Sequence, residues 1–328
     1  MFSVIIPLHN KTDFILRAID SVLQQNFTDF EIIVVNDGST DGSDKKVAER
    51  NHIKLTLINQ DNQGVSVARN SGISQATHEF VVFLDGDDFW HPQFLQQLKL
   101  LIETEPQAGI IGTAISHYYS NQPKEINPNF NFVGENKLSF DCYTAAQYFQ
   151  QAIKSTLITA SSVAIKRDFF AINPGFDPKI KFGEDIDVWF RAILFFGELY
   201  YLPTSFAFYS QEDQNAATKR NYRLDETLMP KIIKDDYYRF ETIQDQLTFQ
   251  AFHDFRIKWI YLRLYPLYKL KSNRKPICDL LAKAQRKFFL AKGVYLLPFG
   301  LLHQLSSSKP FKTLVSKYLN YCYHFIYR

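Results

Sequence analysis

Short apolar runs alternate with helix-like segments through the first 105 residues, and this alternation limits the possible folds more than any other feature. Four runs rich in apolar residues are predicted as strands, the first two of them buried: 3–9, 30–37, 53–59 and 79–85. Segments typical of helices follow them, at 15–23, 44–50, 62–76 and 92–105. A strand–helix repeat of this kind predicts an α/β fold with a mostly parallel sheet and helices on both faces.

Polar residues stand where the predicted strands end. Asn10 follows the first strand, residues 36–41 (NDGSTD) follow the second, and residues 85–88 (DGDD) follow the fourth. Ligands of such sheets bind beside the carboxyl ends of the strands, which lie at one edge. We therefore expect these residues to line one rim of the sheet.

The acidic run at 85–88 requires a compensating positive charge, because three carboxylates within four residues repel one another unless a cation lies among them. A hairpin turn is the simplest alternative, since Asp-Gly favours one. A turn needs a single Asp-Gly, however, and explains neither Asp87 nor Asp88 nor the helix that follows. Clustered carboxylates at a strand end suit a hard divalent cation that phosphates also hold. The pattern favours a metal site and leaves the turn open.

Two further candidates lie in the same half of the chain. Asp37 sits in a loop whose acids could cap the next helix, or it could accept a hydrogen bond from the edge of a nucleotide base. Arg69 lies on a predicted helix, where a lone arginine is usually solvated, but here it could orient Asp37 or contact a nucleotide.

Three acids, Glu184, Asp185 and Asp187, open the predicted helix at 184–194. Acids in a first turn are favourable for the helix dipole, which explains them without a function. Carboxylates near other acids also have the raised basicity that a general base needs. Arg191, four residues after Asp187, is placed to pair with it.

Four segments in order resemble a known family: SVIIPLHN (3–10), DFEIIVVNDGSTDGS (29–43), NQGVSVARNSGISQATHEFVVFLDGDD (62–88) and FGEDIDVWFRA (182–192). Together they are similar to the family 2 nucleotide-sugar glycosyltransferases, which have the GT-A fold, a Rossmann-like sheet. The resemblance covers roughly residues 1–210. It does not by itself define the substrate.

The resemblance implies a role for each motif. Asp85, Gly86 and Asp87 match the Asp-x-Asp signature, with Asp87 as ligand of Mn²⁺ or Mg²⁺ and Asp85 nearer the ribose. Pro7, His9 and Asn10 match the first nucleotide-binding loop, Asp37 the residue that reads the uracil edge, and Arg69 a base-side arginine. Asp185, beside Glu184, matches the general base of an inverting transfer. Asn36 stands where the family usually has Asp, and Gln211, Lys219 and Arg220 are candidates in the segment after the last strand.

The end of the chain differs in charge from the rest. Residues 251–328 carry 15 Lys and Arg against 2 Asp and Glu, whereas residues 1–250 carry 22 against 32. This basic, aromatic stretch is predicted to be helical. It could present a solvated basic face or lie on a membrane surface beside anionic lipid. Nucleic-acid binding is not expected, because no known nucleic-acid motif occurs.

The cysteines and the lengths of the apolar runs indicate the cellular compartment. Cys142, Cys278 and Cys322 show neither metal-ligand spacing nor a disulfide framework, which favours a reducing compartment. No signal peptide and no transmembrane helix are expected, because no apolar run is long enough. We expect a cytoplasmic protein, peripheral on the inner face of the cytoplasmic membrane if the basic region binds lipid.

These observations combine into one functional hypothesis. Residues 1–220 would form a GT-A nucleotide-sugar-binding and catalytic domain, and residues 221–328 a helical, basic, aromatic-rich region for membrane or acceptor contact. The enzyme would move a hexose or N-acetylhexosamine from a UDP-sugar to a growing surface glycan, such as lipopolysaccharide or capsule, with a lipid-linked acceptor fitting the basic region. The alternatives are a catalytically silent nucleotide-sugar-binding protein and a sugar nucleotidyltransferase. The latter would need a glycine-rich phosphate loop near the N-terminus, where residues 3–14 contain no glycine.

Overall fold

A mixed β-sheet is the centre of the first of two compact units, Met1–Arg220 and Asn221–Arg328. The computed structural model describes residues 1–119, 139–152, 157–214, 216–232, 234, 237, 245–268, 270–283, 293–297, 301, 304–305 and 308–322. Within these residues the sheet has nine strands, of which eight follow the order β3-β2-β1-β4-β8-β6-β9-β5, with β7 paired to β9.

The strands and helices of the first unit alternate as the apolar pattern predicts. The strands are β1 (Phe2–Leu8), β2 (Phe30–Asp37), β3 (Leu55–Gln60), β4 (Phe80–Phe83), β5 (Phe89–Trp90), β6 (Ile110–Tyr118), β7 (Asp141–Thr144), β8 (Val163–Lys166) and β9 (Glu198–Ser210). The helices are α1 (Ile15–Leu23), α2 (Ser43–Arg50), α3 (Val65–Gln75), α4 (Phe94–Thr104), α5 (Ala145–Ala152), α6 (Asp168–Ile172) and α7 (Glu184–Phe196), with short 3₁₀ turns η1 (Ala160–Ser162) and η2 (Ala217–Lys219).

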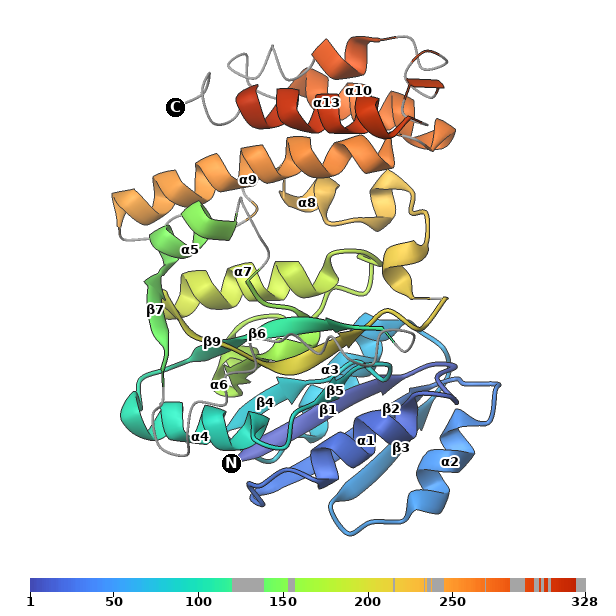
Figure 1. The fold of residues 1–328 in the computed structure, drawn as a ribbon, viewed down its shortest axis with the longest axis vertical. Helices are drawn as coiled ribbons and strands as arrows, with labels where there is room; N and C mark the ends of the chain where they lie inside the picture. Colours follow the sequence, from blue (N-terminus) through green and yellow to red (C-terminus); the bar gives the residue numbers. More distant parts are fainter. Residues whose placement is uncertain are drawn as a thin grey trace. The chain divides into compact units, whose positions relative to one another are not determined.

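The first four strands are parallel, since β1 pairs in parallel with both β2 and β4, and β2 with β3. β8 then runs antiparallel between β4 and β6, and β6 and β9 are parallel again. Helices cover both faces of this sheet (Figure 1). The predicted α/β fold with a mostly parallel sheet and flanking helices is confirmed.

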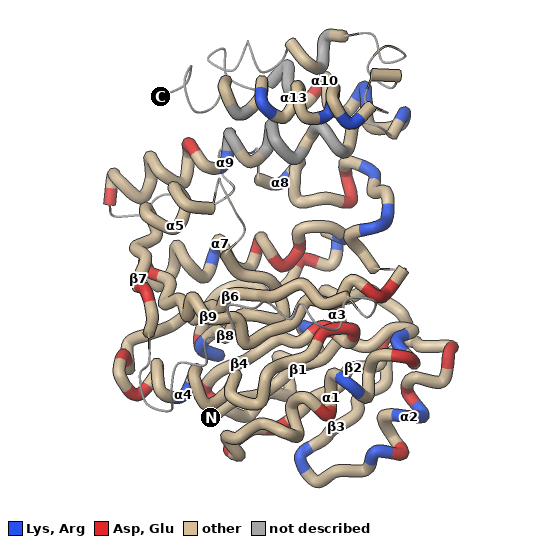
Figure 2. The backbone as a smooth tube through the Cα atoms, viewed as in Figure 1, with Lys and Arg blue, Asp and Glu red and all other residues tan. Residues whose placement is uncertain are grey.

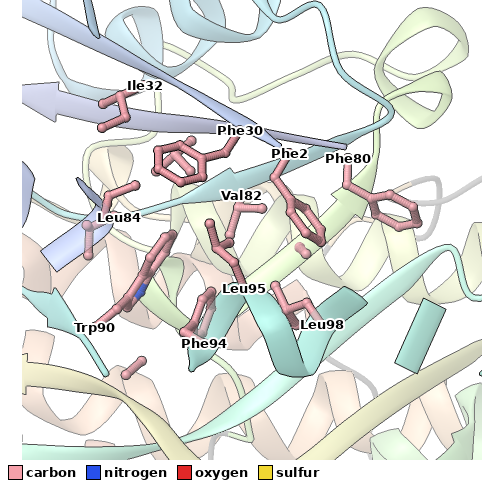
Figure 3. Close-up of a cluster of buried hydrophobic side chains, with 14 of the residues drawn as sticks. Phe2, Phe30, Ile32, Phe80, Val82, Leu84, Trp90, Phe94, Leu95 and Leu98 are labelled. Atoms are coloured by element: carbon pink, nitrogen blue, oxygen red, sulfur yellow. The ribbon is translucent and has the colours of Figure 1, made fainter. Parts of the chain in front are cut away.

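The alternation of side chains along each strand builds two apolar layers. Val4 and Ile6 of β1 belong to a buried cluster that includes residues of α1 and α4. Ile5, between them, faces α3, where a Cβ on Gly72 would lie 2.5 Å from the Ile5 side chain. Figure 3 shows part of the first layer, including Phe2, Phe30, Ile32, Phe80, Val82, Leu84, Trp90, Phe94, Leu95 and Leu98. Burial on both faces explains why the strands are continuously apolar.

One prediction of local structure is wrong. Residues 198–210 were expected to form a pair of strands, but they form the single strand β9. The pairing with β6 shifts register here, because Leu202 lies opposite Thr113 and Ser205 opposite Ala114. Pro203 falls within this shift, where its missing N–H breaks no ladder hydrogen bond. Of the loop predicted at 118–140, residues 120–138 lie outside the described part of the chain.

The second unit is helical where it is described, which confirms the predicted C-terminal helical region. It contains α8 (Met229–Ile232), α9 (Gln246–Leu267), α10 (Arg274–Lys283) and α13 (Lys309–Tyr321), with 3₁₀ turns η3 (Leu224–Glu226), η5 (Lys271–Asn273) and η7 (Gly293–Leu296). Asp245 caps α9 by accepting from Leu247 N and Thr248 N. The buried Asn273 side chain accepts from Leu224 N at 2.8 Å and donates to Leu267 O at 3.1 Å, which ties η3 to the end of α9.

Candidate active site

The rim predicted from the sequence forms at the carboxyl ends of β1, β2 and β4. Because these strands are parallel neighbours, residues 9–10, 36–41 and 85–88 lie at or just after strand ends on the same edge of the sheet. Figure 2 shows acidic positions gathered along this edge. The rim contains three groups of interacting residues.

The first group surrounds Asp37, whose side chain is almost entirely buried (3% exposed). Its carboxylate accepts three hydrogen bonds of 2.8 Å, from Gln60 Nε2, Gln63 N and Gly64 N. These donors fix the orientation of the carboxylate. A carboxylate offers about four acceptor sites, so one position remains for a donor on a ligand.

His9 closes one side of this group. Its Nδ1 lies 2.8 Å from the carbonyl oxygen of Asp37, and the Asn62 amide lies 3.1 Å from the same nitrogen. Gly38 makes the close approach possible, because it has a φ of +65° and a Cβ there would lie 2.8 Å from Asn62 N. The imidazole thus lies beside Asp37, where a flat ring can face a base.

Asn10 and Asn36 hold the loops around Asp37. Asn10 has a left-handed backbone (φ 52°), which asparagine tolerates, and its Oδ1 accepts from Thr40 N at 2.8 Å. Asn36 Oδ1 accepts from Ser39 N at 3.0 Å, so asparagine at this position braces the turn after β2. Pro7 lies within β1, just before His9.

The second group is built on Arg69, which is buried on α3 (3% exposed). Its guanidinium donates to Asp85 Oδ1 at 2.7 Å and to Glu184 Oε1 at 2.8 Å, and it lies 5.1 Å from the centre of the Phe176 ring. Arg69 is neither a solvated surface group nor a partner that orients Asp37. It joins the acidic turn after β4 to the start of α7.

The first turn of α7 carries two carboxylates with raised pKa values. Burial and the neighbouring Asp185 raise the pKa of Glu184 to about 7, although Arg69 opposes the shift. Burial also raises the pKa of Asp185, again against the pull of Arg69. Asp185 Oδ1 accepts from Ile186 N at 2.8 Å. Glu184 is therefore held by the guanidinium, whereas the described residues supply Asp185 with a backbone donor alone.

Asp187 has a structural role in the same turn. It is fully buried and pairs with Arg191 at 3.0 Å, as the four-residue spacing allows. Arg191 also donates to Pro174 O at 2.6 Å and to Gly175 O at 2.8 Å. The pair fixes the segment that precedes α7.

The third group is built on Lys11, from the loop between β1 and α1. Its ammonium pairs with Asp87 Oδ2 at 2.6 Å and also with Asp213 Oδ2. Burial lowers the pKa of Lys11, but the two carboxylates outweigh burial and raise it overall. Burial raises the pKa of Asp87, partly offset by Lys11. A single partly buried cation therefore joins the acidic turn to the segment after β9.

Arg17 reinforces this connection from α1. Its guanidinium donates to the carbonyl oxygen of Asp87 at 2.9 Å and pairs with Glu212 at 2.5 Å. It lies 4.7 Å from the centre of the Phe89 ring. The backbone at Asp87 is thus held by a charge-assisted hydrogen bond.

Asp88 has a different environment from the other two acids of the run. Its buried carboxylate accepts from Ser161 Oγ at 2.5 Å and from Ser210 N at 2.8 Å. Burial, followed by the charges of Asp87 and Asp85, raises the pKa of Asp88 well above its ordinary value. Asp88 connects the acidic turn to η1 and β9 and therefore has a structural role.

The residues around Asp87 fit a divalent cation of the kind the resemblance implies. Within the described part of the chain no three His, Cys, Asp or Glu side chains form a metal-binding group. Asp87 and Asp213 nevertheless share one cation, the Lys11 ammonium, so their oxygens already face a common positive charge. Two carboxylates suit Mg²⁺ or Mn²⁺ when substrate phosphates supply further ligands.

Four of these residues were not predicted from the sequence: Lys11, Arg17, Glu212 and Asp213. The segment after the last strand was singled out for Gln211, Lys219 and Arg220. Lys219 donates to the carbonyl oxygen of Asp213 at 2.7 Å and so holds that segment. An acid pair directly after a strand, Glu212 and Asp213, was the available signal.

The fold and this rim define the class of protein: a GT-A type α/β fold with an acidic edge at the carboxyl ends of its parallel strands. A solved structure of Staphylococcus aureus TarS, residues 1–349 with UDP-GlcNAc, superposes with a TM-score of 0.63 at 16% identity over 98% of this chain and 86% of that chain. A mannosyltransferase from Pyrobaculum calidifontis with GDP-Man and Mn²⁺ gives a TM-score of 0.54 at 17% identity, covering 98% and 85%. At these identities the likeness concerns the fold alone.

The family follows from the sequence profile of Glycosyl transferase family 2, which matches residues 3–171. The chain belongs to this family. It is 35% identical over 136 residues to the glycosyltransferase GlyA of Streptococcus pneumoniae, and this match covers 40% of the chain and 19% of GlyA. The first three curated relatives are matched over 19–35% of their own lengths.

The lengths and apolar character of the described helices show whether any of them could cross a membrane. Helix α9, with 22 residues, is the longest of them, and none combines the length and apolar character needed to cross a bilayer.

Proposed function

We propose that this protein is an inverting, metal-dependent glycosyltransferase that moves a hexose or N-acetylhexosamine from a UDP-sugar to a growing surface glycan, such as lipopolysaccharide or capsule. The observation that carries the proposal is the double ion pair of Arg69 with Asp85 and Glu184. It links the acidic turn after β4 to the first turn of α7, which carries the proposed base Asp185 next to Glu184. TarS with UDP-GlcNAc supports a uridine nucleotide as the donor.

The donor would lie along the rim. Asp37, fixed by three donors, accepts the N–H of the uracil edge while His9 and Asn10 border the base. Asp85, oriented by Arg69, lies on the ribose side. Asp87 and Asp213 would hold Mn²⁺ or Mg²⁺, which when bound neutralises the charge of the diphosphate leaving group. Mn²⁺ accompanies GDP-Man in the related mannosyltransferase fold.

Transfer takes place in one displacement. The acceptor hydroxyl oxygen attacks the anomeric carbon as the bond from that carbon to the phosphate oxygen breaks, and UDP leaves with the electron pair. Asp185 takes the hydroxyl proton. Its raised pKa makes it a better base than an ordinary carboxylate. Attack from the face opposite to UDP inverts the anomeric configuration.

The experiment that tests the donor site is calorimetric titration with UDP, with GDP and TDP as controls, in the presence and absence of Mn²⁺. Wild type is expected to bind UDP in a metal-dependent way, and Asp87→Ala is expected to abolish this dependence. Transfer is then screened with UDP-sugars, and the anomeric configuration of the product is measured by NMR. Absence of nucleotide binding with any metal would refute the proposal.

The basic C-terminal region would bring the enzyme to a cytoplasmic membrane face and its lipid-linked acceptor. Helix α13 supports this, because Leu314, Tyr318 and Tyr321 are exposed at a helical spacing of four and three residues. Lys312 and Lys317 lie on the same helix and are also exposed. Aromatic and aliphatic side chains flanked by lysines are typical of helices that lie on anionic lipid.

Sedimentation with lipid vesicles tests this part of the proposal. The protein is expected to sediment with phosphatidylglycerol vesicles and to remain in solution with phosphatidylcholine vesicles. Leu314→Asp is expected to reduce sedimentation, with Thr313→Asp on the same helix as a control for added charge. Equal behaviour with both lipids would indicate a solvated basic face.

A further inference from the structure

We propose that the Lys11 ammonium is a resident counter-ion of the Asp87–Asp213 pair, and that it moves from these carboxylates to the donor diphosphate when the divalent cation binds. Metal and nucleotide would then bind cooperatively, each weakly without the other. The inference rests on the proposed function, because it assumes that Asp87 and Asp213 hold the metal.

The geometry gives Lys11 the position of a bridging cation. Its ammonium contacts one oxygen of each carboxylate. The side chains of Lys11, Asp87 and Asp213 are 20%, 14% and 8% exposed, so solvent screens the pair only in part. The three residues come from the loop after β1, the turn after β4 and the segment after β9. These segments meet at the ammonium.

A metal ion therefore competes with Lys11 for the same oxygens. Two nearby carboxylates without a cation repel strongly in a partly buried site, which favours the ammonium when no metal is present. A divalent cation that enters alone must displace the ammonium and leave it beside a second positive charge. Free metal is consequently expected to bind weakly to the protein without nucleotide.

The diphosphate of the donor lowers the cost of displacing the ammonium, because its oxygens can accept hydrogen bonds from Lys11. A diphosphate carries several strong acceptor oxygens, and an ammonium has three donors on a flexible stem. The stem lies close to Gly86, where an added Cβ would lie 3.6 Å from Lys11 Cγ and 3.3 Å from Pro7 O, so a larger residue at position 86 would restrict its movement. The exchange places the metal on the carboxylates and Lys11 on the phosphates, so that each cation faces an anion.

The expected signature is a thermodynamic coupling between metal and nucleotide. If the affinity for Mn²⁺ rises by some factor when UDP is bound, the affinity for UDP rises by the same factor with Mn²⁺. Without the ammonium, free Mn²⁺ no longer competes with a cation for these oxygens and binds more tightly. The coupling should then become smaller, because UDP no longer relieves a displaced cation.

The experiment measures Mn²⁺ binding by electron paramagnetic resonance of the free ion, with and without UDP, on the full chain. In wild type we expect UDP to tighten Mn²⁺ binding about tenfold or more. In Lys11→Met we expect Mn²⁺ to bind about tenfold more tightly without UDP, and the coupling factor to fall to a similar extent. Lys46→Met is the matched control, since Lys46 is exposed and donates to Thr12 O at 2.8 Å in the same region. It should behave as wild type.

The outcomes separate the two proposals. If Mn²⁺ binding to Lys11→Met without UDP is unchanged or weaker and the coupling persists, Lys11 is only a structural cation and the inference is wrong, while the proposed function stands. If wild type binds no UDP with Mn²⁺, both are wrong. Wild type alone also decides the matter if Lys11→Met fails to fold, because equal Mn²⁺ affinity with and without UDP would overturn the inference.

Discussion

Replacing Arg69 by methionine is expected to cost more stability than any other single charge removal at the rim. Arg69 is 3% exposed and pairs with Asp85 and Glu184 at 2.7 and 2.8 Å. Removing one partner of a buried ion pair leaves charges uncompensated and typically costs about 3–5 kcal/mol. Methionine fills a similar volume, so the loss arises from charge and not from a cavity. We expect Arg69→Met to lower the free energy of unfolding by about this amount near pH 8.

The loss of unfolding free energy caused by Arg69→Met should be larger at high pH than at low pH. The pKa of Glu184 in the folded protein is about 7 and already raised, so this group stabilises the fold most when protonated, and its contribution falls as the pH rises toward 7. Without the Arg69 cation the pKa of Glu184 rises further. Each added pKa unit corresponds to about 1.4 kcal/mol at high pH. The loss caused by Arg69→Met should therefore be smaller at pH 5 than at pH 8 by about 1–3 kcal/mol.

Urea unfolding followed by circular dichroism between pH 5 and pH 8 measures these values. The double variant Arg69→Met/Glu184→Gln should recover part of the stability at pH 8, because it removes one uncompensated charge. Arg50→Met is the matched control. Arg50 pairs with Asp20 at 2.6 Å but is 44% exposed, so its loss should cost about 1 kcal/mol or less. A pH-independent loss in Arg69→Met, without recovery in the double variant, would refute the reasoning.

Three further predictions concern the site. Asp185→Asn should reduce transfer by about 10²–10⁴-fold and leave UDP affinity unchanged, as measured by initial rates and calorimetry; a normal rate would exclude Asp185 as the base. Because burial raises the pKa of Asp185, kcat should rise with pH across a range above that of an ordinary aspartate. A rate profile from pH 4 to pH 9 that is already flat above pH 5 would contradict this. Gly38→Ala should lower stability by about 1–2 kcal/mol and weaken UDP binding, because Gly38 has φ +65° and its added Cβ would lie 2.8 Å from Asn62 N. Thermal unfolding and calorimetry measure both effects, and unchanged values would show that the loop adapts.

The sheet and its rim could be predicted because their signals are local. Strands β1, β2 and β4 are largely apolar, the edge strand β3 alternates apolar with polar residues, and polar residues stand at or just after the ends of the strands. Parallel connection then brings these ends to one edge without any knowledge of long-range contacts. The start of α7 was equally visible as an acidic run before an apolar helix. The sequence thus sufficed for the fold class, which the structure and the family profile confirm.

The pairing of charges could not be predicted, because it depends on contacts between distant segments. Arg69 meets Glu184 across 115 positions, and Lys11 meets Asp213 across 202. Nothing near Arg69 in the sequence distinguishes a buried bridge from a solvated surface group. The single long strand β9 was missed for a related reason, since Pro203 predicts a break unless the register shift opposite Ala114 is known.

The acidic run at 85–88 shows what these distant contacts decide. Its three carboxylates would repel one another in isolation, yet each meets a different partner in the fold. Asp85 pairs with the guanidinium of Arg69, Asp87 pairs with the ammonium of Lys11, and Asp88 accepts from neutral donors while its own pKa is raised. The repulsion is thus relieved at Asp85 and Asp87 by a cation each, and at Asp88 by a raised pKa that favours the protonated form. The Arg69 side chain is 3% exposed and the Lys11 side chain 20%, so we propose that the charge at Asp87, which meets the more accessible cation, is the one that a metal ion takes over.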